Sequence, residues 1–137
     1  MGILHALSII AAYSTVLASV TDCSKGASQF KVSSLSFLPD PPVKGENSTL
    51  SVSMTVPQEV SGGTATYAYK YNFIPMTPEV KDLCGEVPGN CPIKPGPLDI
   101  VNSFLIPSEL SGTITVTVTW KDTANVQLLC VAISFKV

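Results

Sequence analysis

The sequence contains no arginine, and its only histidine is His5. All eight basic residues are lysines, charged residues make up 13% of the chain, and the formal net charge at pH 7 is −2. A protein that binds nucleic acid needs a basic face and usually contacts phosphates and bases with arginine. The composition therefore excludes nucleic acid as a partner.

Residues that support catalysis or bind metals are also scarce. His5 lies in an N-terminal stretch that we expect to be cleaved, so the remaining chain has no histidine for a Ser-His-Asp or Cys-His arrangement or for an ordinary zinc site. The carboxylates are few and scattered over turn segments, and glycine-rich phosphate-binding motifs are missing. An enzyme is therefore the least favoured class, and we predict no catalytic residue, no metal and no cofactor.

The first twenty residues carry no charged side chain, and Leu4 to Val20 is an apolar run shorter than a typical membrane span. We interpret residues 1–20 as a signal peptide, with cleavage between about residues 18 and 22, after Val16-Leu17-Ala18. The remaining residues, 21–137, then form one secreted domain. The only glycosylation sequon begins at Asn47, in a polar loop where a glycan would fit.

Four cysteines in an oxidising compartment are expected to form two disulfides, and they are Cys23, Cys84, Cys91 and Cys130. Three pairings are possible. A bridge across the short loop from Cys84 to Cys91 is geometrically easy, because Pro88-Gly89 turns the chain there, and it would leave Cys23 and Cys130. The same turn-forming residues exclude a helix in this loop. We further expect the loop to constrain the mouth of any binding pocket.

Apolar residues alternate with polar ones through most of the remaining chain. The pattern is most regular in Ser48–Val56 and Thr113–Trp120, where Ser or Thr occupies the second face, as is typical of half-buried antiparallel strands. Further strands are expected in segments with less regular patterns, which are Gln29–Phe37 with a bulge at Ser33-Ser34, Thr64–Ile74, Leu98–Ile106 and the segment ending at Val137.

A row of aromatic residues, Tyr67, Tyr69, Tyr71 and Phe73, occupies one face of Thr64–Ile74. It suits either a packed core or the wall of a cavity. The chain after the N-terminal stretch has no helical periodicity and no internal repeat, and its hydrophobic content is enough for one core. About seven strands in one domain predict an all-β, two-sheet antiparallel sandwich.

Two functions suit such a sandwich. An extracellular immunoglobulin-like interaction module without a lipid ligand usually has a tryptophan between two cysteines that join the sheets, whereas here Trp120 shortly precedes Cys130. A lipid carrier accounts for strand faces that are more apolar than so short a chain needs. It requires neither a catalytic residue nor a metal. An apolar slot and a bilayer both stabilise a buried methylene by about 0.8 kcal/mol, so a lipid can load and unload without a large net change in free energy. We favour the carrier and keep the interaction module as the alternative.

Several segments occur in an order that resembles the ML-domain lipid-recognition family across residues 21–137. They are DPPVKGENSTLSVS, SGG, DLC, CPI followed by glycine, and the closing Cys130. The family includes the soluble Niemann-Pick type C sterol-transfer protein and plant and fungal phosphatidylglycerol/phosphatidylinositol transfer proteins. The resemblance implies an immunoglobulin-like β-sandwich with an internal lipid cavity, and the disulfides Cys23–Cys130 and Cys84–Cys91.

The resemblance also implies a function and a location. We expect a monomer that carries a sterol or phospholipid, that contacts membranes transiently for loading and unloading, and that is secreted or lies in the lumen of an endosome, lysosome or vacuole. Met76 stands where the sterol protein has a phenylalanine at the pocket mouth, and Ile106-Pro107 matches a Leu-Pro step. Ser108 in place of valine, and the lack of a third disulfide, leave phospholipid and fatty acid open as ligands.

Strand phase, with Met76 added from the resemblance, predicts the residues that line the lipid cavity. A register slip of one residue would exchange the whole set contributed by a strand. The predicted lipid-binding residues are Val52, Met54, Tyr69, Tyr71, Phe73, Met76, Phe104, Ile106, Val116, Val118, Trp120, Val131, Ile133 and Phe135.

Overall fold

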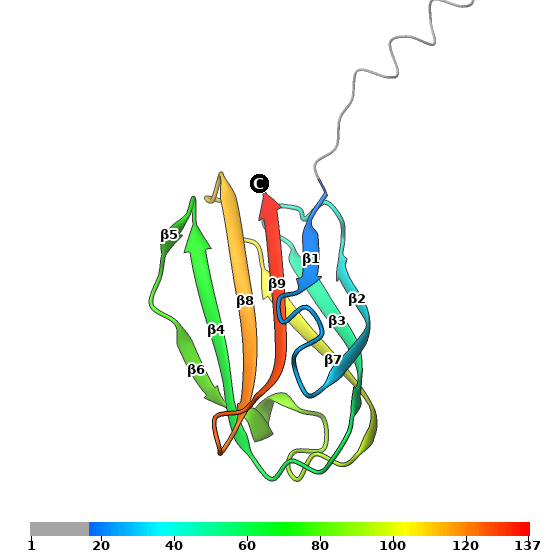
Figure 1. Ribbon diagram of the computed structural model, residues 1–137. Coiled ribbons are helices and arrows are strands. Elements are labelled where there is room, and N and C mark those ends of the chain that lie inside the picture. The colour runs from blue at the N-terminus through cyan, green and yellow to red at the C-terminus, as the bar shows by residue number, and fades with distance from the viewer. Residues whose placement is uncertain (1–16) are drawn as a thin grey trace, which may run out of the picture.

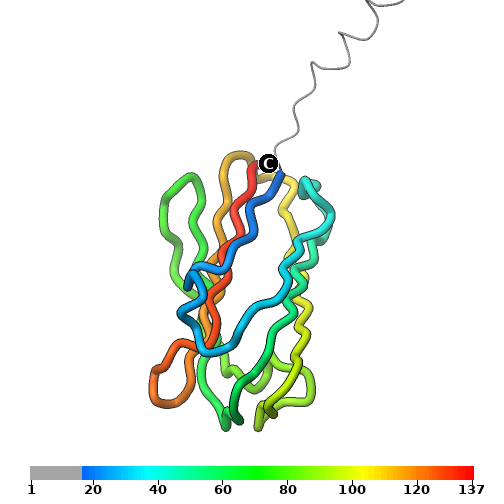
Figure 2. The backbone as a smooth tube through the Cα atoms, turned by 45° about the vertical axis from the view of Figure 1, so that its right-hand side comes forward, coloured from blue at the N-terminus to red at the C-terminus, as the bar shows by residue number. Residues whose placement is uncertain are grey.

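The computed structural model describes residues 17–137, which form two antiparallel β-sheets packed face to face (Figure 1). The first sheet has the order β1-β9-β8-β4-β5, with β6 also paired to β4, and the second has the order β2-β3-β7. Figure 2 shows these sheets as two layers. The predicted two-sheet sandwich is therefore confirmed, and the N-terminal signal prediction falls largely outside the described residues.

Nine strands make up the described part of the chain, rather than about seven. The first sheet contains β1 (Ser19–Asp22), β4 (Gly63–Tyr71), β5 (Ile74–Pro75), β6 (Glu79–Asp82), β8 (Thr113–Asp122) and β9 (Gln127–Lys136). The second contains β2 (Lys31–Leu38), β3 (Asn47–Val56) and β7 (Gly96–Leu105).

The six long strands match the predicted segments, and the register of β2 against β3 shifts between Val32 and Ser34, as the predicted bulge requires. The three short strands were not predicted, because β1 overlaps the expected cleavage region, β5 has two residues, and β6 is charged and exposed. The Cys84–Cys91 loop contains no α-helix, as predicted. One turn of 3-10 helix, η2 (Leu83–Glu86), begins after Asp82, whose carboxylate accepts a hydrogen bond from Cys84 N at 3.0 Å.

The core lies between the sheets and follows the alternation read from the sequence. On β8 the buried row runs from Ile114 through Val116 and Val118 to Trp120, while the intervening threonines are half-buried on the outer face. Phe30 packs edge-on against Trp120, with ring centroids 6.4 Å apart. Each fully buried side chain of this size contributes about 1.5 to 3 kcal/mol through the hydrophobic effect.

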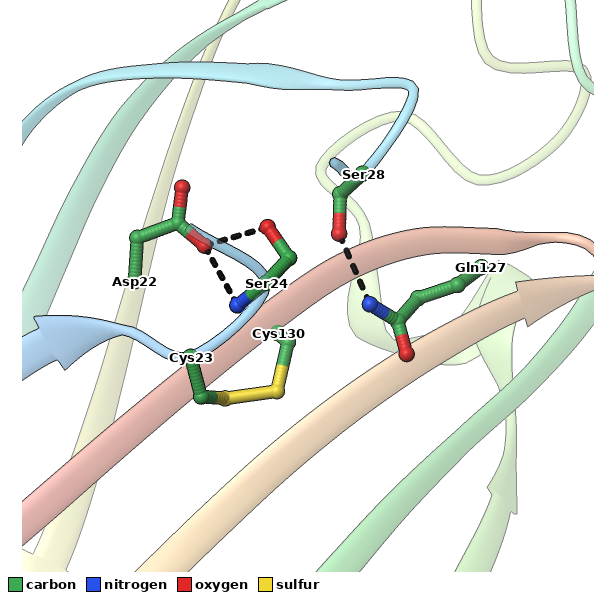
Figure 3. The surroundings of a disulfide bond; sticks show 6 residues. All are labelled: Asp22, Cys23, Ser24, Ser28, Gln127 and Cys130. Carbon is green, nitrogen blue, oxygen red and sulfur yellow. Dashed lines mark hydrogen bonds between the residues drawn. A yellow bond between two sulfur atoms is a disulfide. The ribbon is translucent and has the colours of Figure 1, made fainter. Parts of the chain in front are cut away.

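One edge of the sandwich is fastened where the chain passes from β1 in the first sheet to β2 in the second. Cys23 is bonded to Cys130 of β9 (Figure 3). Cys23 N also donates to the Cys130 carbonyl at 3.1 Å. Gln127 Nε2 donates to Ser28 Oγ at 3.0 Å, and the Asp22 carboxylate accepts from the backbone and hydroxyl of Ser24. The segment between β1 and β2 is therefore held against β9 before it crosses to the other sheet.

The Cys84–Cys91 disulfide lies at one end of the sandwich, in the loop that precedes β7. Leu83 and Val87 of this loop are buried, and so is Ile93, which exchanges two backbone hydrogen bonds with Val60 at 2.8 and 3.0 Å. Side chains and backbone thus close this end, which lies at the bottom of Figure 1. Both disulfides implied by the family resemblance are present.

Removing the Cys23–Cys130 bridge should lower stability more than removing the Cys84–Cys91 bridge. The two bridges span 107 and 7 residues, and the loop-closure model assigns them about 4 to 5 and about 2 to 3 kcal/mol respectively. Urea unfolding of the two double-alanine variants measures the difference. An equal loss in both variants would contradict this ranking.

Candidate functional site

An apolar cavity of about 220 Å³ lies between the sheets at the end opposite the Cys84–Cys91 loop. Strand β7 spans the distance, since it begins at Gly96 after the loop and ends at Leu105 beside the cavity. The second sheet contributes Phe37 and Phe104, and the first sheet contributes residues of β4, β8 and β9. The lining residues are Phe37, Tyr69, Phe104, Leu105, Ile106, Pro107, Leu110, Ile114, Val116, Ile133 and Phe135.

The cavity adjoins a second apolar hollow of about 250 Å³, which reaches the surface. Tyr69, Leu110 and Ile114 line both spaces. The outer hollow adds Lys70, Tyr71 and the exposed side chain of Met76. Together the two spaces form an apolar route from the interior to the surface.

A hairpin from β4 to β5 borders the outer hollow. Tyr71 pairs with Ile74, so Asn72 and Phe73 form a two-residue turn, and both have positive φ angles of 49° and 69°. Asn72 is fixed by hydrogen bonds to Thr113, with its N donating at 2.8 Å and its Oδ1 accepting at 2.8 Å. Phe73 is 79% exposed in a conformation that bulky residues rarely adopt. The hairpin therefore displays an unsupported aromatic ring beside the apolar route.

The structure brings together only part of the predicted lining. Six of the predicted residues line the inner cavity, and they are Tyr69, Phe104, Ile106, Val116, Ile133 and Phe135. Two more, Tyr71 and Met76, line the outer hollow. Five are buried in the core but line neither space, and they are Val52, Met54, Val118, Trp120 and Val131.

Phe73 was placed wrongly on the inward row of its strand. Strand β4 ends at Tyr71, and the turn that follows directs Phe73 to the surface. The five core residues have the predicted inward orientation, but they line neither of these spaces nor the hollow of about 350 Å³ that residues between 87 and 98 form at the closed end. Strand phase distinguishes inside from outside and does not show at which end of a strand the sheets separate.

Five lining residues were missed. Phe37 and Ile114 belong to apolar rows that the alternation did reveal, so that signal was available. Leu105, Pro107 and Leu110 lie at the end of β7 and in the following loop, where no periodicity applies. No residue of the Cys84–Cys91 loop lines the inner cavity or the outer hollow, whereas Glu86 of this loop lines a separate polar pocket, so the expected role of the loop at a pocket mouth stays a prediction.

A polar side pocket of about 150 Å³ lies beside the inner cavity, between β4 and β6 on one sheet and β7 on the other. Lys81 Nζ lies 3.2 Å from Glu79 Oε1 and 3.7 Å from Glu86 Oε1, and Tyr67 Oη donates to Glu86 Oε1 at 3.2 Å. The lining residues are Tyr67, Tyr69, Lys81, Glu86, Asn102, Ser103 and Phe104.

Electrostatics in this side pocket favour neutral tyrosines and a charged lysine. Burial, followed by the nearby Glu86 carboxylate, raises the pKa of Tyr67 well above its usual range, and burial also raises the pKa of Tyr69. The hydrogen bond to Glu79 is the main cause that raises the pKa of Lys81. The side pocket therefore keeps its phenol protons and its ammonium group at neutral pH.

Among residues 17–137, no three or more His, Cys, Asp or Glu side chains are grouped so that they could hold a metal ion. The same residues include no helix that is long and apolar enough to span a membrane.

Comparison with known proteins identifies relatives of the chain. Residues 18–137 match the family model of the ML domain. The putative phosphatidylglycerol/phosphatidylinositol transfer protein 2 of Dictyostelium discoideum is 33% identical over 110 residues, which cover 77% of this chain and 77% of that protein.

Two solved structures share the fold. A Niemann-Pick type C2 protein from the Japanese carpenter ant superposes with a TM-score of 0.66 at 17% identity, over 86% of this chain and 98% of that chain. Chicken MD-1 complexed with lipid IVa superposes with a TM-score of 0.63 at 16% identity, over 90% of this chain and 91% of that chain.

The raised pKa of Tyr67 predicts alkaline sensitivity. In the unfolded chain its phenol ionises near pH 10, whereas the folded protein retains the proton, so its contribution to stability is complete below about pH 10 and is lost as pH rises further. Glu86→Gln removes one of the causes and should lower the pKa of Tyr67 and weaken the alkaline loss. Tyrosinate absorbance and urea midpoints across this pH range measure both effects, and identical profiles for the two proteins would contradict the assignment.

Proposed function

The chain belongs to the ML-domain family, and from this membership and its apolar cavity we infer that it binds and transports lipid. The observation that best supports this function is the apolar route from the interior to the surface. A cavity without polar groups does not hold water well, and one of about 150 Å³ already binds a molecule such as benzene. The larger inner cavity here suits part of an acyl chain.

The whole lipid needs more space than the inner cavity provides. Ligand pockets generally measure about 300 to 1,000 Å³, which exceeds the 220 Å³ of the inner cavity. We therefore propose that the cargo occupies the outer hollow as well, and that the sheets separate at this end when it binds. Each buried methylene would contribute about 0.8 kcal/mol, which is close to what a bilayer offers, so that lipid exchanges without a large net change in free energy.

We propose a glycerophospholipid as the cargo, rather than a sterol. The relative with 33% identity bears the name of a phosphatidylglycerol/phosphatidylinositol transfer protein, whereas the Niemann-Pick type C2 structure supports the fold alone. The protein would act as a carrier and not as an enzyme, with lipid as its only small-molecule partner. The interaction module without a ligand does not account for an apolar cavity that opens to the surface.

We propose that the protein follows the secretory route and works outside the cell or in an endosomal, lysosomal or vacuolar lumen. Its two disulfides suit an oxidising compartment. Strand β1 begins at Ser19, which favours signal cleavage after Ala18, because this leaves the pairing of β1 with β9 intact. Asn47 is exposed at the start of β3 and could accept a glycan there.

Filling the inner cavity should abolish lipid binding without unfolding the protein. Ile133 lines the cavity, so the larger side chain of Ile133→Trp should occupy the space meant for an acyl chain and reduce binding more than tenfold. Extraction of the purified protein followed by mass spectrometry, and titration with a fluorescent fatty acid, measure the loss.

Val131→Trp is the matched comparison, because Val131 is fully buried two residues away on β9 but borders no cavity. Overpacking there should lower the free energy of unfolding by about 1 to 3 kcal/mol or more. If the folded Ile133→Trp protein still loaded lipid as the unaltered protein does, the assigned cavity would be wrong.

Loading also requires contact with a membrane, and we propose that the hairpin from β4 to β5 makes it. Phe73, Ile74 and Met76 are exposed apolar side chains close to the outer hollow. Exposed apolar groups that cluster beside an apolar opening are typical of surfaces that meet a membrane or another apolar partner. A lipid leaving the bilayer here would enter the route directly.

Replacing Phe73 with glycine separates this role from stability. Glycine adopts positive φ without strain, so Phe73→Gly should preserve or raise the thermal midpoint. Loss of the exposed ring should reduce association with phosphatidylcholine–phosphatidylglycerol vesicles about threefold or more, measured by co-flotation. Val101→Ser, which removes an exposed side chain from the outer face of β7, is the control and should bind vesicles normally. Equal flotation of both variants would argue against the hairpin as the segment that contacts the membrane.

A further inference from the structure

Asn102 interrupts the apolar inward row of β7. It pairs with Leu50, which is buried between the sheets, and its neighbours on the same face are Ile100 and Phe104. The Nδ2 atom of Asn102 is buried and has no hydrogen-bond partner. A buried amide without a partner is destabilising, and such groups in native proteins call for an explanation. An absent ligand that accepts a hydrogen bond is one such explanation.

Polar side chains from several elements surround Asn102. Tyr67 and Tyr69 reach it from the inward face of β4, Lys81 from β6, and Glu86 from η2. Lys81 Nζ also lies 5.5 Å from the centre of the Tyr67 ring. These groups come from separate parts of the chain and meet where β7 faces β4 and β6 across the unpaired edge of the sandwich.

The polar side pocket adjoins the apolar cavity, because Tyr69 and Phe104 line both spaces. A molecule with its apolar chain in the inner cavity could therefore place a polar end among Asn102, Lys81 and Glu86. The side pocket and the outer hollow are two distinct exits, one polar and one apolar.

Charge and hydrogen-bonding capacity indicate which polar end fits. One ammonium, Lys81, faces the two carboxylates Glu79 and Glu86, so the pocket does not favour an additional dianionic phosphate. A choline group has no hydrogen-bond donor or acceptor to satisfy Asn102. Hydroxyl groups both donate and accept, which matches a set that mixes amide and phenol donors with carboxylate acceptors.

We propose that Asn102, Tyr69, Lys81 and Glu86 form a headgroup subsite for a polyhydroxylated lipid headgroup, which leaves the sandwich through its side between β4 and β7. This inference rests on the proposed function, because the headgroup enters the subsite only when the acyl chain occupies the inner cavity. It assigns the Cys84–Cys91 loop a role as well, since Cys84 belongs to η2 and Glu86 lies within the loop that the disulfide closes.

Two variants test the subsite in the full-length mature protein. Asn102→Leu removes the unpartnered amide, and Glu86→Gln removes a carboxylate while keeping its shape. The measured quantity is the affinity for phosphatidylinositol or phosphatidylglycerol divided by the affinity for phosphatidylcholine and phosphatidic acid with the same acyl chains. The unaltered protein should prefer the polyol headgroups. In each variant this ratio of affinities should fall at least tenfold. Asn102→Leu should also raise the urea midpoint, because no buried amide remains unsatisfied.

Thr117→Leu on the outer face of β8 is the control for adding an apolar side chain, and it should keep the preference. Cis-parinaric acid, a fluorescent fatty acid, tests the proposed function separately. If the protein binds cis-parinaric acid but binds all four phospholipids with equal affinity, the headgroup subsite alone is overturned. Variants that retain the polyol preference would have the same consequence. Failure of the unaltered protein to bind any of these probes would overturn the proposed function and the subsite together.

Discussion

The two sheets are fastened along one edge and face each other without backbone pairing along the other. At the fastened edge, the Cys23–Cys130 bridge and the hydrogen bonds around Gln127 hold the chain just before it passes to β2. At the opposite edge, β7 lies across from β4 and β6, and no ladder joins them in the described residues. The proposed separation of the sheets would use this unpaired edge, so that cargo could enter and leave while the fastened edge and the core stay intact.

The two ends of the sandwich differ in which residues lie between the sheets. On β8 the row ends with Trp120 near the closed end and begins with Ile114 and Val116 at the cavity. On β3 the row begins with the small, buried Ser48, which pairs with Phe104 beside the cavity. At the closed end the side chains of Leu83, Val87 and Ile93 are buried together with Trp120. At the other end the loop after β7 contributes Pro107 and Leu110 to the lining, and an apolar cavity remains between the sheets.

The sequence was sufficient for the fold and for about half of the site. Alternation located the six long strands, and the slip at Ser33-Ser34 located the bulge, because both are local properties of the chain. The position of the cavity depends on how two sheets meet, which no local pattern contains. The apolar residues on both faces of β7 concealed the inward Asn102, whose significance depends on groups from three other elements. The turn at Asn72-Phe73 lacked the glycine that usually marks a hairpin with two positive φ angles.

The backbone conformation of Phe73 and the buried amide of Asn102 are both locally unfavourable, and both residues lie on the proposed lipid route. A bulky residue with positive φ is strained, and a buried amide without a partner is destabilising, so stability alone would favour glycine at one position and leucine at the other. Local conflicts of this kind are expected at functional sites. The exposed ring stands where an apolar chain would enter, and the amide stands where a polar headgroup would rest. In the proposed function each position would become favourable in contact with a lipid, in the bilayer for Phe73 and in the side pocket for Asn102, and this would relate the two positions to one function.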